Sequence, residues 1–169
     1  MTWNNARFPT LLYMTRFVAV LPLAPLAVGD GFSATAWPLH VTIVSNFTTD
    51  ATVERIGAEL STNATAMDVE VGGEAMFGPR ENVPVSLVRH SEPLATLHRA
   101  LVARLRSLDV VFDNPNFIDA GYRPHVTATR HASASDGDRL RLTQLTLVDM
   151  EPHGDAGLRR VVWETALGD

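Results

Sequence analysis

Two segments of this chain, WPLHVTIV at 37–44 and YRPHVTAT at 122–129, repeat one short pattern 85 positions apart. In each, a proline stands shortly before a histidine, and a threonine follows the histidine two positions later. Both segments contain the β-branched residues that strands favour. A chain of 169 residues that carries the same strand pattern once in each half is expected to fold into two similar lobes.

Each histidine is expected to share one face of its strand with its threonine. Side chains two positions apart in a strand point the same way, so His40 projects with Thr42 and His125 with Thr127. If the lobes face each other, two imidazoles and two hydroxyls meet in one cleft. Histidine titrates near neutral pH, so one imidazole can accept a proton while the other donates one, as displacement at phosphorus requires. The hydroxyls can donate hydrogen bonds to the phosphate oxygens.

A structural interpretation of the same residues stays open. Histidine and threonine are common enough here that two HxT triplets can arise by chance and serve only as strand residues. A zinc site is not indicated, because the chain has no HExxH-like cluster and no cysteine. We therefore expect neither a metal nor a cofactor.

The rest of the chain predicts many strands and two helices, and the short connections favour antiparallel pairing. The fold class is therefore α+β with two lobes. We expect helices at 51–60 and 92–107, a turn at Gly72-Gly73, and strands at 16–21, 39–47, 67–73, 83–90, 123–129, 141–150 and 158–167.

Composition and charge limit where in the cell the protein is expected and which ligands it is expected to bind. The apolar stretch near the N-terminus is interrupted by Arg16, and no uncharged run of 18 residues follows, so neither a signal peptide nor a membrane span is expected. Residues 1–13 are interpreted as an extension and residues 14–169 as a single bilobal domain. The absence of cysteine fits a cytoplasmic protein. A net charge of −5 argues against long duplex nucleic acid but permits a small phosphorylated ligand.

Four segments together resemble the 2H phosphoesterase superfamily, which includes 2′-5′ RNA ligase-like proteins and cyclic phosphodiesterases. They are RFVAVLPL, HVTIVSNF, PHVTATR and LTQLTLVDM. The resemblance implies two pseudo-symmetric lobes around a cleft and metal-independent phosphodiester chemistry. By the same resemblance His40 and His125 are the acid–base pair, and Thr42 and Thr127 bind the phosphate oxygens. The first motif departs from the family pattern in being shortened before His40 and in carrying SNF after it, which leaves the substrate open.

Four further residues are candidates for substrate contact. Trp37 and Tyr122 are placed to stack on a base at the cleft mouth, or alternatively to pack at strand ends. Arg123 and Arg130 carry the guanidinium fork that suits phosphate. Arg130 stands at an odd spacing from His125 and would face away in an unbroken strand.

The remaining histidines and large apolar residues have simpler interpretations. His98 is expected to face solvent on its helix, and His131 is close enough to the second motif to line the cleft. Trp163 is expected to pack in the last strand, and the core methionines are expected to be Met67, Met76 and Met150.

The function expected from these features is metal-independent hydrolysis of small ribonucleotide phosphodiesters. The substrate options are a 2′,3′-cyclic phosphate or 2′-5′ linkage at an RNA end, and a cyclic oligonucleotide signal of the kind that some phage-encoded members of the superfamily destroy as a counter-defence. The alternative is a binding module that sequesters a nucleotide in the same cleft without cleaving it. The oligomeric state stays open.

Overall fold

The computed structural model describes residues 14–169, so the interpretation of 1–13 as an extension falls outside it. The strands and helices have the following bounds: β1 Thr15–Pro22, β2 Gly31–Ser33, β3 His40–Thr49, α1 Val53–Leu60, β4 Met67–Phe77, β5 Val83–Val88, α2 Glu92–Leu105, β6 Val111–Phe112, β7 His125–Thr127, β8 Arg139–Leu142, β9 Gln144–Asp149 and β10 Leu158–Ala166.

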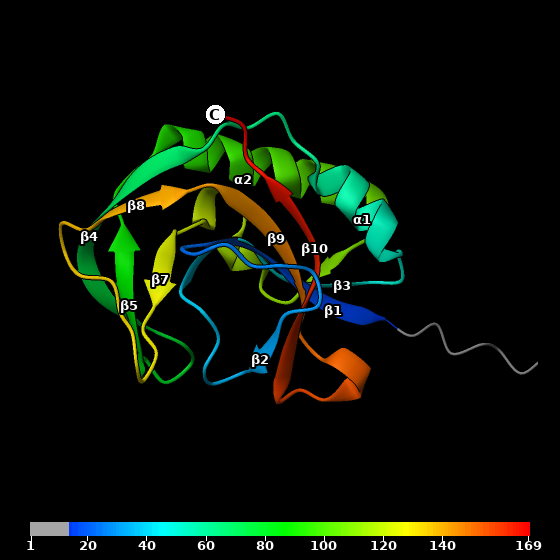
Figure 1. The fold of residues 1–169 in the computed structure, drawn as a ribbon, viewed down its shortest axis with the longest axis horizontal. Helices are drawn as coiled ribbons and strands as arrows, with labels where there is room; N and C mark the ends of the chain where they lie inside the picture. The colour runs from blue at the N-terminus through cyan, green and yellow to red at the C-terminus, as the bar shows by residue number, and fades with distance from the viewer. Residues whose placement is uncertain (1–13) are drawn as a thin grey trace, which may run out of the picture.

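All ten strands join one curled sheet, and all pairings between them are antiparallel (Figure 1). The strand order is β2-β10-β9-β1-β3-β7-β5-β4-β8, with β6 paired to β3. Strands β3 and β7 meet through the pair Val41–Val126, which divides the sheet into two halves. The α+β class and the two-lobed architecture are thereby confirmed. No helix within residues 14–169 has the length and apolarity to cross a membrane.

The two helices lie side by side over one face of the sheet (Figure 1). Ser91 caps α2 by accepting a hydrogen bond from the backbone N–H of Leu94. The helix then buries an apolar stripe that includes Leu97 and Leu101. The main core therefore lies between the helices and the sheet, and the opposite face of the sheet is left for a site.

One expected strand proves to be two. The run predicted at 141–150 divides at Thr143 into β8, which pairs with β4 in one half, and β9, which pairs with β1 and β10 in the other. The chain crosses between halves here, and local alternation of apolar residues does not reveal which partner each part of a run will pair with.

Two other local predictions were wrong. Gly72-Gly73 is not a turn: strand β4 continues through both glycines, and a register shift between Val71 and Glu74 accommodates them. Met76, expected in the core, is 52% exposed because it lies near the projecting end of the β4–β5 hairpin. Met67 and Met150 are buried as expected, and Trp163 packs against the core.

Candidate active site

The pairing of Val41 with Val126 places the two HVT triplets side by side in opposite directions. Extending this antiparallel register by one residue sets His40 across from Thr127 and Thr42 across from His125. Cross-strand neighbours of this kind have Cβ atoms about 5 Å apart. Because the two valines are completely buried, the four polar side chains share the opposite face of the sheet.

The two histidines are held by the same local hydrogen bond. Nδ1 of His40 donates to the carbonyl oxygen of Pro38 at 2.8 Å, and Nδ1 of His125 donates to that of Arg123 at 2.8 Å. A carbonyl oxygen can only accept, so each neutral imidazole carries its proton on Nδ1. Neither Nε2 has a hydrogen-bond partner among residues 14–169, so both lone pairs are available to a ligand.

Burial favours the neutral form of both imidazoles in the unliganded protein. It lowers the pKa of His40 to about 4; the bond to Pro38 opposes this effect, and the positive charge that His125 can carry adds to it. Burial also lowers the pKa of His125, with a further contribution from the cation of Arg123. His40 is the more strongly desolvated of the two, so it is the weaker base toward solvent protons.

All four side chains line one cavity of about 680 Å³, which is within the usual size range of small-molecule sites. The cavity lies on the face of the sheet opposite the helices. Among residues 14–169 there is no group of three or more His, Asp or Glu side chains arranged like metal ligands.

An aromatic ring and an arginine flank each histidine in the same order. The Trp37 ring lies 4.0 Å from the His40 ring, and the Arg159 guanidinium carbon lies 6.0 Å from the Trp37 centroid. In the other half, the Phe77 ring lies 4.7 Å from the His125 ring, and Arg123 lies over Phe77 at 5.0 Å. These distances join ring centroids or a guanidinium carbon to a centroid. The two halves thus repeat their surroundings as well as their HVT triplets.

Tyr122 anchors the first motif from the side. Its hydroxyl donates to the backbone oxygen of Thr42 at 2.9 Å, and burial raises its pKa above the ordinary value. Its ring stacks on His98 with centroids 3.9 Å apart and planes 5° apart. Tyr122 lines the cavity, but its polar atom is already occupied by the protein.

The prediction that His98 faces solvent was wrong, since only 1% of it is exposed. Its Nδ1 donates to the backbone oxygen of Ile43 at 2.6 Å, and its Nε2 accepts from the backbone N–H of Asp119 at 2.9 Å. This pattern requires the neutral ring, and burial lowers the pKa of His98 accordingly. The apolar stripe of α2, on which His98 lies beside Leu97 and Leu101, was the signal that could have placed it inside.

The other predicted contact residues divide into two groups. Trp37 and Arg123 line the cavity. Arg130 and His131 are exposed and do not line it, because the strand ends at Thr127 and the chain turns away.

Several cavity residues were not predicted from the sequence. Phe77 and Phe117 lie with centroids 6.4 Å apart and planes 11° apart, and Phe117 is 44% exposed. Arg159 and Arg16 enter the cavity from β10 and β1. No local pattern marks these residues, because they come from four distant segments that only the tertiary fold brings together.

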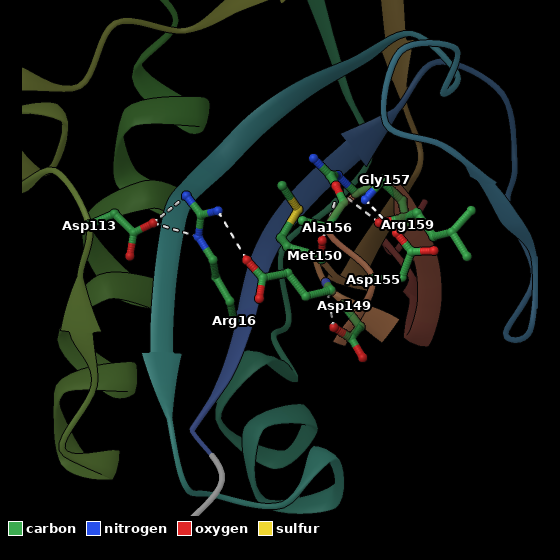
Figure 2. A network of polar contacts seen from close by, with 10 residues as sticks. Arg16, Asp113, Asp149, Met150, Asp155, Ala156, Gly157 and Arg159 are labelled. Atoms are coloured by element: carbon green, nitrogen blue, oxygen red, sulfur yellow. Dashed lines mark hydrogen bonds and ion pairs between the residues drawn. The ribbon is translucent and has the colours of Figure 1, made fainter. Parts of the chain in front are cut away.

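Arg16 and Arg159 differ in how their charges are used (Figure 2). Both Nε and Nη2 of Arg16 contact one carboxylate oxygen of Asp113, at 2.7 Å and 2.6 Å, and its Nη1 lies 3.7 Å from a carboxylate oxygen of Glu151. Arg159 instead donates from Nη1 to three backbone oxygens, those of Met150 and Leu158 at 2.7 Å and that of Ala156 at 2.9 Å. The charge of Arg16 is therefore paired with carboxylates, whereas Arg159 is fixed by backbone oxygens and has no counter-ion among residues 14–169.

The chain is similar to known proteins over most of its length. A model of the 2′-5′ RNA ligase superfamily matches residues 24–149. A crystal structure of a phosphoesterase is 15% identical with a TM-score of 0.63, and the match covers 93% of this chain and 100% of that one. The protein TT0787 of Thermus thermophilus is 18% identical with a TM-score of 0.55, with 91% and 99% covered. A search of curated proteins found no match.

Escherichia coli LigT has the same fold. Its complex with NADP+ is 14% identical to this chain with a TM-score of 0.60, with 92% of this chain and 99% of LigT covered. LigT has also been crystallised with ATP and with 3′-AMP. Since the family model spans well over half of the sequence and the fold agrees, the chain belongs to the 2′-5′ RNA ligase superfamily of 2H phosphoesterases.

Proposed function

We propose that this protein is a phosphodiesterase that cleaves small ribonucleotide phosphodiesters between His40 and His125. The observation that carries the proposal is the cross-strand arrangement of two histidines and two threonines in one cavity, where neither Nε2 has a hydrogen-bond partner within the described chain. Membership of the superfamily supports phosphoesterase or ligase-type activity. The complexes of LigT with NADP+, 3′-AMP and ATP support a small nucleotide as the substrate.

The proposed mechanism uses one histidine as base and the other as acid. Nε2 of His40 takes the proton of the attacking oxygen, which is water for a cyclic phosphate or the neighbouring 2′-hydroxyl for an open ribose diester. The new P–O bond forms as the opposite one breaks, and Nε2–H of His125 protonates the leaving oxygen. We assign the base role to His40 because its pKa, about 4, is low enough to keep it neutral in the resting protein.

His125 must be protonated before it can act as the acid. Its pKa is lowered by burial in the free protein, but a bound phosphate brings negative charge next to it and favours the imidazolium. The hydroxyls of Thr42 and Thr127 would donate to the non-bridging oxygens, where charge increases in the transition state. The set needs no metal or cofactor, and we place the reaction in the cytoplasm.

Three substrate classes fit this chemistry: 2′,3′-cyclic phosphates, 2′-5′ linkages and cyclic oligonucleotide signals, the last as a phage counter-defence. The alternative is that the same cavity binds a nucleotide without turning it over. The flanking aromatic rings and arginines would serve either role.

Mass spectrometry of a nucleotide panel incubated in excess EDTA tests the proposal. The panel holds 2′,3′-cyclic nucleotides, 2′-5′ and 3′-5′ dinucleotides, and cyclic di- and trinucleotides. The control proteins are His40→Ala/His125→Ala and His90→Ala/His131→Ala, because the second pair changes two exposed histidines that lie outside the cavity. The proposal is supported if wild type and His90→Ala/His131→Ala cleave a ligand and His40→Ala/His125→Ala does not. Intact ligands together with a stoichiometric complex would favour the binding module.

A further inference from the structure

Arg159 combines a firm anchor with an unused hydrogen-bonding edge. All of its hydrogen bonds leave from Nη1. Nε is buried without a partner, and Nη2 has no hydrogen bond to any of residues 14–169. Nε and Nη2 form the side of the guanidinium that binds two phosphate oxygens at once. The anchor thus leaves the edge that recognises phosphate without a hydrogen-bond partner among residues 14–169.

The charge of Arg159 is also left without a counter-ion. No carboxylate lies within ion-pair distance of it among residues 14–169, and Glu151, whose charge acts on Arg159, contacts Arg16 instead. Burial, with the neighbouring cation of Arg16, lowers the pKa of Arg159, while Glu151 opposes this effect. A partly buried cation without a partner is costly, and a bound anion would offset that cost.

Arg159 lies within the length of one nucleotide from His40. The Trp37 centroid is 4.0 Å from the His40 ring and 6.0 Å from the guanidinium carbon of Arg159, so these two groups are at most the sum, about 10 Å, apart. Two phosphates on one ribose can span such a distance. Val18 and Met150, which cluster with Trp37, also line the cavity and add apolar surface to it.

We propose that Arg159 binds a second phosphate of the substrate, one nucleotide away from the phosphate at His40 and His125. The inference rests on the proposed function and narrows its substrate class. It favours phosphodiesters that carry a second phosphate, such as 5′-phosphorylated ends, dinucleotides with a further phosphate and cyclic oligonucleotides, over a nucleoside 2′,3′-cyclic phosphate alone.

Calorimetric binding of 3′-AMP and of adenosine 3′,5′-bisphosphate tests the second site without any turnover. Wild type is expected to bind the bisphosphate about 10- to 100-fold more tightly, as charge-assisted hydrogen bonds to one phosphate predict. Arg159→Gln should bind the two ligands nearly equally, because glutamine lacks the cationic two-nitrogen edge. The matched control is Arg160→Gln, which changes an exposed arginine in the same strand on the other face and should keep the preference.

Equal binding of both ligands by wild type, or a preference that survives in Arg159→Gln, would overturn the second site. If Arg159→Gln fails to fold, Arg159→Lys replaces it, because lysine keeps the charge but lacks the two-nitrogen edge and should reduce the preference.

The hydrolase proposal is tested separately with adenosine 2′,3′-cyclic phosphate bearing or lacking a 5′-phosphate. Preferential binding without cleavage would contradict the hydrolase and leave the second site standing, whereas cleavage indifferent to the 5′-phosphate would contradict the second site alone.

Discussion

Val41 pairs with Val126 across the boundary between the two halves of the sheet, and both side chains are completely buried. Since strand side chains alternate, burying these two valines turns the residues on either side of each toward the cavity. The antiparallel direction then sets each histidine opposite the threonine of the other strand. One apolar pair therefore fixes the geometry of four polar side chains.

Replacing either histidine should remove turnover while the fold is kept. His40→Ala and His125→Ala each lose a proton-transfer group, a change typically worth about 100- to 10,000-fold in rate. The measurement is kcat/KM in EDTA, with thermal unfolding to verify the fold. His90→Ala, at a histidine whose side chain is 81% exposed, is the control and should retain full activity. Full activity in either active-site variant would rule out the paired mechanism.

The threonines should matter less than the histidines. Thr42→Val and Thr127→Val keep the β-branched shape but remove a hydroxyl donor, so kcat should fall on the order of 10- to 1000-fold. Thr129→Val is the matched control, because its hydroxyl contacts the backbone around Ala132 rather than the cavity. A kcat for either cavity variant equal to that of the control would exclude a transition-state role for that hydroxyl.

The pH profile of kcat/KM should be bell-shaped, with its maximum at acidic pH. The base must be neutral, which for His40 holds above its pKa of about 4, and the acid must be charged, which for His125 requires a pH below its lowered pKa. The maximum should therefore fall between about pH 4 and 6.5. Bound phosphate favours the imidazolium, so the profile of kcat should lie at higher pH. A flat profile from about pH 5 to 9 would contradict this assignment.

The same pKa values predict how stability changes with pH. Above its ordinary pKa of 6.5, His40 is neutral in both folded and unfolded chains and adds no pH dependence. As the pH falls from 6.5 toward about 4, the unfolded chain takes up the proton first, so the free energy of unfolding decreases. The slope is about 1.4 kcal/mol per pH unit for this group.

Urea unfolding of wild type and His40→Gln at several pH values measures that slope. His98 and His125 have lowered pKa values too and act in the same direction, so the variant should be less pH-dependent than wild type but not independent of pH. Identical slopes for the two proteins would show that His40 is not desolvated in the folded state.

Tyr122→Phe should lower the free energy of unfolding, because the Tyr122 hydroxyl holds the strand that carries His40 and Thr42. The change removes the donor to the backbone oxygen of Thr42, and losing this part-buried hydrogen bond should cost about 0.5–1.5 kcal/mol of stability. The ring remains to stack on His98. Chemical unfolding measures the loss, and kcat should fall by less than in the histidine variants. An unchanged free energy of unfolding would indicate that water replaces the phenol.

Part of the site could be read from local sequence. The HVT triplets predicted strands, and the two-residue period predicted that each histidine shares a face with its threonine. The approximate positions of the helices followed from caps and apolar spacing. The wrong predictions concern features that depend on contacts distant in the sequence. The two parts of the run 141–150, divided at Thr143, pair with strands in opposite halves of the sheet, and Met76 is exposed because it lies near the projecting end of a hairpin.

By itself, the sequence determined which side chains are paired within a strand, because alternation is a property of the backbone. Only the tertiary structure decided which strands are neighbours and in what register, because those depend on contacts between residues distant in the chain. The Val41–Val126 pair, the burial of His98 and the unpartnered Nε of Arg159 all arise in this way. The sequence thus indicated the candidate reactive groups. The packing of the two halves set the spacing of these groups, lowered the pKa values of His40 and His125, and placed Arg159 beside Trp37.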